Sequence, residues 1–126
     1  MTGATYDAGA LIAAERGSQE MRALHRRLLD NGVRPTVSTA VLAQVWRGGP
    51  QPRLSRLLRG CRVVPLDERQ ACAAGAALAR SATDDVIDAV VVVTALQRRD
   101  VIVTSDPQDM QRIASGVGGE VLVQVV

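Results

Sequence analysis

The chain has 126 residues, a length that fits one domain over 1–126 with a core of its own. Apolar residues make up 47% of it and the net charge is +2, which excludes a disordered chain and gives no reason by itself to expect nucleic-acid binding. Two cysteines exclude a disulfide framework and a cysteine-rich zinc site. No apolar run is long enough to cross a membrane, and the start does not resemble a signal peptide. We therefore expect a cytoplasmic protein with no membrane partner.

Short apolar runs alternate with segments of helical spacing along the chain. Ser18 and Gly32 bound one such segment, since serine is a good N-cap and glycine often follows a helix end. Asp67 opens an alanine-rich helix in the same way. Alternating strands and helices predict an α/β fold, in which a mainly parallel sheet of about five strands lies between two layers of helices. The apolar runs that we expect to be strands cover 4–7, 35–38, 62–66, 101–105 and 120–126.

The segment from Thr83 to Arg98 is rich in valine, which alone would suit a strand. It is too long for a typical strand, and its first three residues, with two aspartates, make a good helix start, so we expect a buried helix. Asp88 is then predicted to lie past the first turn among apolar neighbours, with Asp85 on the same face. Because an ionised carboxylate in such a place is costly unless something pairs with it, Asp88 is the strongest candidate for a functional acid.

Other acids follow the predicted strands. Asp7 ends the first apolar run, Asp106 ends the fourth, and Asp109 comes soon after. If these two strands are neighbours in a parallel sheet, Asp7 and Asp106 lie at the edge where ligands bind, and the buried helix can bring Asp85 and Asp88 to them. Several carboxylates cannot stay ionised together without a cation, and an all-oxygen site suits Mg²⁺ or Mn²⁺.

Four of these acids also have a purely structural explanation. Asp7 can cap the helix that follows it, and Asp106 can cap a helix that begins at Pro107. Asp85 and Asp109 can lie in first helical turns, where a negative charge complements the helix dipole. Both explanations stay open at this point for each of the four.

Three motifs and their order carry a resemblance. They are YDAGALIA at 6–13, DVIDAVVVVTAL at 85–96 and VIVTSDPQDM at 101–110. This order resembles that of PIN domains and, more narrowly, of the VapC toxins of bacterial toxin–antitoxin pairs, over residues 5–114. The resemblance implies an Mg²⁺- or Mn²⁺-dependent endoribonuclease with an RNA substrate and products bearing a 3′-hydroxyl and a 5′-phosphate. It further implies a homodimer that a cognate antitoxin inhibits by binding a groove near the active site.

The resemblance also implies roles for particular residues. Thr104 or Ser105 would orient a carboxylate or a metal-bound water through its hydroxyl. A carboxylate, Asp85 or Asp109, would take the proton from the attacking water. Carried over by position, the acids of the site are Asp7, Asp88 and Asp106 as metal ligands and catalytic residues, Asp85 as an accessory catalytic residue, and Asp109 as an accessory metal ligand.

One position departs from the family pattern. In VSTAVLAQVWRGG the family usually has a glutamate where this chain has Gln44. An amide oxygen can still coordinate a metal, but it contributes no negative charge, so affinity for a second cation should fall. A weakened enzyme is one reading. The alternative is a PIN-fold binding module without catalysis.

All fifteen basic residues other than the single histidine are arginines. The stripe of Arg53, Arg56 and Arg59 is predicted to hold the RNA backbone, although coding bias explains any one of them equally well. Trp46 is a candidate for stacking on a base, and a place in the core or at an antitoxin contact fits it as well. The apolar side chains of 41–46 and 54–58 line either the antitoxin groove or the core.

Overall fold

The computed structural model describes residues 2–126. In that range five short strands form one sheet in the order β3-β2-β1-β4-β5, and every pairing is parallel. Each strand falls within one of the predicted apolar runs, so the predicted strands and the parallel sheet are confirmed. The strands are β1 (Ala4–Tyr6), β2 (Thr36–Ser38), β3 (Arg62–Val64), β4 (Val101–Thr104) and β5 (Val123–Val125).

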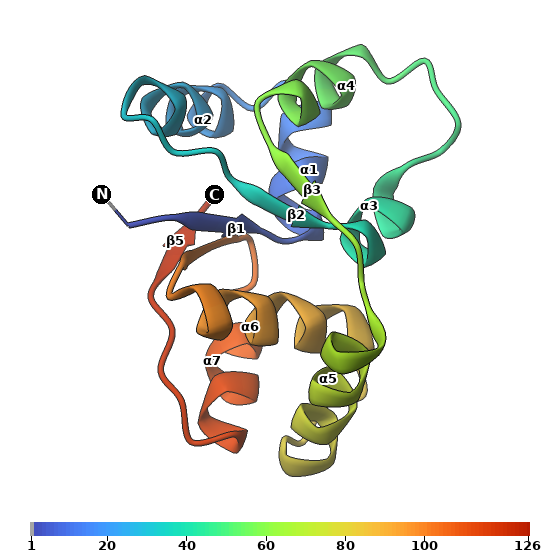
Figure 1. Cartoon of the computed structure of the whole chain (residues 1–126). Coiled ribbons are helices and arrows are strands. Elements are labelled where there is room, and N and C mark those ends of the chain that lie inside the picture. Colours follow the sequence, from blue (N-terminus) through green and yellow to red (C-terminus); the bar gives the residue numbers. More distant parts are fainter. Residues whose placement is uncertain (1) are drawn as a thin grey trace.

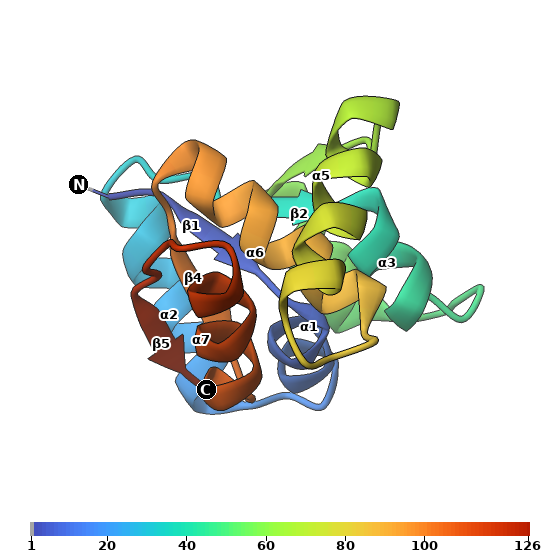
Figure 2. The same cartoon turned by 90° about the horizontal axis from the view of Figure 1, so that it is seen from below.

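Helices cover both faces of this sheet. Figure 1 shows α1, α2 and α4 on one side and α5, α6 and α7 on the other, with α3 at the edge of the sheet, and Figure 2 shows the second group from below. The predicted three-layer α/β/α architecture is confirmed. Within residues 2–126 every helix is too short or too polar to cross a bilayer. The helices are α1 (Ala8–Glu15), α2 (Gln19–Asp30), α3 (Thr39–Val45), α4 (Pro52–Arg59), α5 (Glu68–Arg80), α6 (Val86–Arg98) and α7 (Pro107–Gly116).

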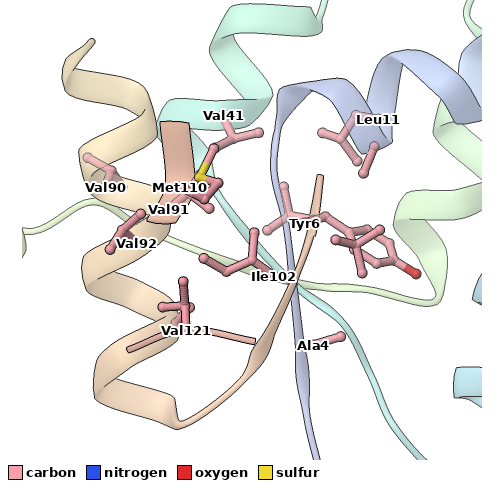
Figure 3. Close-up of a cluster of buried hydrophobic side chains, with 14 of the residues drawn as sticks. Ala4, Tyr6, Leu11, Val41, Val90, Val91, Val92, Ile102, Met110 and Val121 are labelled. Atoms are coloured by element: carbon pink, nitrogen blue, oxygen red, sulfur yellow. The ribbon is translucent and has the colours of Figure 1, made fainter. Parts of the chain in front are cut away.

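The core is centred on β1, β4 and α6. All residues of β1 are buried, and so is the run from Ala89 to Ala95 on α6, because this helix lies between the sheet, α5 and α7. Figure 3 shows Val90–Val92 of α6 on one side of β1 and the Tyr6 ring on the other. The prediction of a helix that is buried around most of its circumference is confirmed. Burial of this many apolar side chains is the main stabilising contribution to the fold.

The start of α6 corrects one prediction. The helix begins at Val86 rather than Thr83, and its N-cap is Asp85, whose Oδ1 accepts a hydrogen bond from the backbone N–H of Asp88 at 3.0 Å. The Thr83 hydroxyl instead accepts from the N–H of Asp85 at 3.3 Å. Asp88 therefore lies in the first turn and is half-buried, and the prediction that it lies past the first turn was wrong. The helix dipole favours a negative charge there, so burial alone does not single out Asp88.

Candidate active site

The parallel pairing of β1 and β4 places two of the predicted acids at one edge of the sheet. Tyr6 is opposite Val103, and the N–H of Asp7 donates to the Val103 carbonyl at 3.2 Å. Asp7 is thus the first residue beyond β1, and Asp106 follows the end of β4 by two residues. This is the carboxyl edge of the sheet, at the point in Figure 1 where the chain passes from β1 into α1. The prediction that the first and fourth strands are neighbours in a parallel sheet is confirmed.

Thr104 connects the two acids. Its buried hydroxyl donates to Oδ2 of Asp7 and accepts from the backbone N–H of Asp106 at 2.8 Å. The other oxygen of Asp7, Oδ1, accepts from the N–H of Ala10 at 2.9 Å and so caps α1. Asp7 therefore has the structural role that its position allowed, and its second oxygen is held toward β4 at the same time. Of the two hydroxyl residues that the resemblance named, Thr104 is the one that contacts a carboxylate.

Ser105 contributes through packing. Its Oγ lies so close to the Cα of Gly9, in the first turn of α1, that a Cβ at this position would overlap it. The same Cβ would lie 3.3 Å from Oδ1 of Asp7. Gly9 therefore allows α1 and the segment after β4 to approach closely around Asp7. Sequence reasoning missed this requirement, because the two segments are far apart in the chain.

Asp106 and Asp109 lie at the beginning of α7. Asp106 occupies the N-cap position before Pro107, but its side chain accepts no capping hydrogen bond. The capping explanation therefore does not account for this carboxylate, which is exposed. Asp109 lies in the first turn, and its pKa is raised by a hydrogen bond with Asp106 and then by the negative charge of that residue. Arg112 approaches from the following turn, with Nη1 at 3.4 Å from Oδ1 of Asp109.

The pKa of Asp88 is affected by all the other carboxylates of the group. Partial burial raises its pKa most, and the charges of four neighbouring carboxylates add to the effect, so that it reaches about 7. In decreasing order these neighbours are Asp85, Asp7, Asp109 and Asp106. The pKa of Asp7 is also raised, chiefly by burial, against the opposing effect of its hydrogen bonds. The structure thus brings all five predicted acids into one electrostatic neighbourhood, which we call the acid cluster.

The chemistry of the acid cluster fits a hard divalent cation. Its donors are carboxylate oxygens, the ligands that Mg²⁺ and Mn²⁺ prefer. Burial and then mutual repulsion raise the pKa of Asp88, and a bound cation would relieve the repulsion. Within residues 2–126 no three Asp, Glu, His or Cys side chains already stand close enough to share one ion. Binding by three of these carboxylates therefore requires at least one side chain to turn toward the ion.

Gln44 and Trp46 lie at the C-terminal end of α3. Gln44 is exposed on α3, a helix that contacts both α1 and α6. Its amide adds no charge, so the acid cluster has no acid from α3. Trp46 is the C-cap of that helix and is 41% exposed, which leaves its ring accessible to a ligand. The other large side chains of α3 and α4 belong mainly to the core: Val41, Val45, Leu54 and Leu57 are buried.

The arginine stripe lies away from the acid cluster. Arg56 lines a cavity of about 200 Å³ together with Arg22 and His25 of α2, and the cavity reaches Ala14 and Gly17 at the end of α1. Asp7 is at the opposite end of that helix, and eight helical residues span about 12 Å. The cavity and the acid cluster are therefore separate features. The cavity could not be read from the sequence, because it forms between helices distant in the chain.

The cavity is open to a partner and rich in positive charge. It shares Arg22, His25, Leu29 and Arg56 with a wider groove of about 720 Å³ along α2. None of the arginines that line either space forms an ion pair within residues 2–126. The remaining arginines lining the two spaces are Arg26 and Arg53.

Comparison with known proteins places the chain in a family. The PIN domain family matches residues 5–116, so the chain belongs to the PIN domain family. No protein of curated function matches it in sequence. Among solved structures, a chain of VapBC2 from Rickettsia felis, bound to a DNA fragment from its promoter, is 13% identical with a TM-score of 0.76, and the match covers 98% of each chain.

Two further structures share the fold. DNA-bound VapBC from Salmonella typhimurium is 19% identical over 99% of this chain and 98% of that one, with a TM-score of 0.71. A toxin–antitoxin complex from Klebsiella pneumoniae is 19% identical over 84% and 88%, with a TM-score of 0.68. At such identities the likeness establishes the fold, and the chemistry has to be argued from the acid cluster itself.

Proposed function

We propose that the chain is a metal-dependent endoribonuclease, a VapC-like toxin that a cognate antitoxin holds inactive. The observation that carries the proposal is the acid cluster, in which carboxylates from the ends of β1 and β4 and the starts of α6 and α7 lie close enough to add to the effect of burial on Asp88, whose pKa reaches about 7. Membership of the PIN domain family and the shared fold with chains of toxin–antitoxin complexes support it.

The metal would be held by Asp7, Asp88 and Asp106, with Asp109 as a further ligand. The chemistry that bound Mg²⁺ or Mn²⁺ supplies in such a site is a water of lowered pKa and neutralisation of charge on the phosphate. Thr104 prepares the site in advance, because its one hydroxyl fixes both the Asp7 carboxylate and the backbone of Asp106. A site that is held in position before the substrate arrives loses less entropy in the reaction.

Asp85 is the acid best placed to accept the proton of the attacking water. Its Oδ1 is occupied by the N–H of Asp88, which fixes the carboxylate at the start of α6. Its Oδ2 accepts no hydrogen bond from residues 2–126 and is available for a proton. Asp109 remains the other candidate, but it is engaged with both Asp106 and Arg112. The proton would therefore pass to Oδ2 of Asp85.

Gln44 supports the alternative function, a PIN-fold binding module without catalysis. Without an acid on α3, the acid cluster has fewer charges with which to hold a second cation. Against this alternative, Asp7 keeps its buried position beside Asp106, and Thr104 still orients it. We therefore favour an active nuclease that uses a single cation.

The test is cleavage of structured RNA by the purified chain in Mg²⁺, in Mn²⁺ and in EDTA. Asp88→Asn, prepared identically, controls for contaminating ribonuclease, and Gln44→Glu tests the missing acid. We expect cutting by the wild type that depends on the cation and is absent from Asp88→Asn. Activity only in Gln44→Glu would mean a fold whose chemistry is disabled at one residue. No cutting by any of the three proteins would favour the binding module.

We also propose that the antitoxin occupies the cavity between α2 and α4. An apolar side chain would contact Leu29 and Leu57, and acidic side chains would pair with the arginines around them. An antitoxin at Arg56 would cover the arginine stripe that we propose as an RNA contact, so that inhibitor and substrate would compete. Trp46, at the end of α3, stays a proposed base-stacking residue.

A homodimer is the remaining part of the proposal. Large apolar side chains are exposed around β3 and α3, among them Trp46, Val63 and Leu66. The loop after β3 lies against α3, since the N–H of Leu66 donates to the Thr39 hydroxyl at 3.0 Å. Exposed apolar side chains of this kind often mark an interface. Light scattering at increasing protein concentration tests this, and a monomer at every concentration would contradict it.

A further inference from the structure

Arg112 is the one basic residue that forms an ion pair with the acid cluster, within residues 2–126. It lies one turn after Asp109 on α7. Helical side chains lean toward the N-terminus of their helix, so the guanidinium points back toward the end of α7 where the acids lie. The other ion pair of the described chain, Arg98 with Asp100, lies at the opposite end of β4. Arg112 therefore lies at the rim of the acid cluster and pairs with one of its five acids, Asp109.

This contact can be exchanged easily. The Nη1 to Oδ1 distance is 3.4 Å, and the two side chains are 52% and 36% exposed. Exposed ion pairs of this geometry are weak, because water screens them and both side chains lose freedom. A helix pair three residues apart is also common without any function. The surface beside Arg112 is the second feature that indicates a role for it.

A surface hollow of about 340 Å³ begins directly beside the acid cluster. It runs between α7 and β5, from Pro107, the residue after Asp106, to Ser115 and Val123. Gln108 and Arg112 line it, both exposed, and neither donates to any group in residues 2–126 except for the contact of Arg112 with Asp109. By contrast, Gln111 is engaged, since its Nε2 donates to the Val121 carbonyl at 3.2 Å.

The free donors of this hollow suit a phosphate. A guanidinium binds phosphate oxygens through two parallel N–H donors, and an amide can add a third donor to phosphate or ribose. RNA that approaches five carboxylates is repelled unless positive charge meets its backbone. Arg112 is placed to provide that charge next to the acids, whereas the arginine-lined cavity lies at the far end of α1.

We propose that the hollow between α7 and β5 holds the phosphate of the nucleotide next to the cleaved one, and that Arg112 is its main ligand. The inference rests on the proposed function and names a substrate contact for the same site. On RNA binding, Arg112 exchanges Asp109 for the phosphate and so frees the carboxylate that we propose as a further metal ligand. Arg112 is thus a substrate-positioning residue.

The test measures binding of a fluorescein-labelled single-stranded RNA to the Asp88→Asn protein, which does not cut its ligand. We compare Arg112→Ala and Arg112→Lys across a range of salt concentrations. Arg69→Ala is the matched control, because Arg69 is an exposed arginine on α5 that forms no ion pair within residues 2–126. Loss of one phosphate contact lowers the salt slope by about 0.7, which is about fivefold in affinity at 0.1 M salt. Arg112→Lys should keep the slope, and Arg69→Ala should change neither quantity.

A second comparison separates direct contact from screening. If Arg112 only neutralised Asp109, the effect of Arg112→Ala would vanish in an Asp109→Asn background, and the proposal would be overturned. A direct contact predicts that the fivefold loss persists. In the active protein, Arg112→Ala should raise KM by about the same factor, with a smaller change in kcat. Circular dichroism confirms that each variant is folded.

The outcomes also separate this inference from the proposed function. Cleavage by the wild type, with affinity and KM unchanged in Arg112→Ala, would overturn the inference and leave the nuclease in place. Binding that depends on Arg112, in a protein that never cuts, would support the inference and contradict the nuclease.

Discussion

The β1–β4 pair has a buried aspartate side chain at each end, and the partners of the two carboxylates differ. Asp100 lies before β4, its side chain is 7% exposed, and its Oδ2 receives the Thr5 hydroxyl at 2.8 Å and Nε of Arg98 at 3.4 Å. Asp7 lies after β1 at the other end. It also receives a threonine hydroxyl, but the charged neighbour that acts on it is a second carboxylate, that of Asp106.

The difference separates a structural acid from a functional one. Asp100 is paired with a cation and a hydroxyl from its own chain, so its charge is compensated when the protein folds. Burial raises the pKa values of Asp7 and Asp88, and the charges that act on them are those of other acids, which raise the two pKa values further. A carboxylate cluster that lacks an internal cation is costly to keep for stability alone. We therefore expect the carboxyl edge to bind a cation from solution and the opposite edge to bind none.

The largest expected effect is on catalysis. Asp7→Asn removes a metal ligand and should lower RNA cleavage by at least about 100-fold. Asp100→Asn, at the matched position on the opposite edge, should keep the wild-type rate per folded molecule. Both are measured as initial rates at saturating Mn²⁺. Equal losses in the two variants would show that the edges do not differ in function.

The second-largest expected effect is on stability. Here the substitution at the opposite edge, Asp100→Asn, should have the larger effect, and a substitution in the acid cluster the smaller one. Asp100→Asn removes the buried carboxylate that accepts from the Thr5 hydroxyl and pairs with the half-exposed Arg98, which should cost about 1 kcal/mol in the free energy of unfolding. Asp88→Asn should cost nothing in the absence of divalent cations, because it removes a repelled charge. Urea denaturation in EDTA measures both. If the Asp88→Asn protein were less stable than the Asp100→Asn protein, the assignment of Asp100 as a structural acid and Asp88 as a functional one would be contradicted.

Substitution of Thr104 should have a smaller and more specific effect on the cleavage rate. Thr104→Val keeps the shape but leaves the N–H of Asp106 without its acceptor and Asp7 without its donor, so we expect activity to fall about tenfold. The Thr104 hydroxyl lowers the pKa of Asp7, so its loss should also move the acidic limb of the pH–rate profile upward. Thr104→Ser should restore both. A rate loss with an unmoved profile would mean a packing defect only.

The smallest effect is the pH dependence of stability. The pKa of Asp88 rises from 3.8 to about 7 on folding, so the folded state binds the proton more tightly than the unfolded state. Stability is therefore lost as pH rises from about 4 to about 7. In EDTA the Tm of the wild type should fall relative to Asp88→Asn by roughly 2–5 °C over this range, since the group is half-buried. A gap between the two proteins that does not change with pH would contradict the shift.

Much of the fold could be predicted because its determinants are local. Apolar runs with β-branched residues gave all five strands, and Ser18 and Asp67 cap the helices that they were expected to cap. Asp7 and Asp106 could be brought together because strand ends meet at one edge of a parallel sheet. The site was predictable to the extent that it depends on this rule.

The features that could not be predicted depend on competition between neighbouring capping residues or on contacts between segments distant in the chain. Residues 83–85 all have side chains that can cap a helix, and Asp85 does so because its carboxylate reaches the N–H of Asp88 while Thr83 is engaged with Asp85. No local pattern decides between such neighbours. The overlap of Gly9 with Ser105 and the cavity between α2 and α4 arise only when distant segments pack. The pair of Asp109 and Arg112 was visible in the spacing and was overlooked.

The most direct test of the central claim is calorimetric titration of Mn²⁺ into the wild type, Asp88→Asn and Asp100→Asn at pH 8. If the acid cluster binds a divalent cation from solution, the wild type and Asp100→Asn should bind Mn²⁺ with similar affinity, and binding should be lost or at least tenfold weaker in Asp88→Asn. No binding by the wild type, or equal binding by Asp88→Asn, would contradict the account.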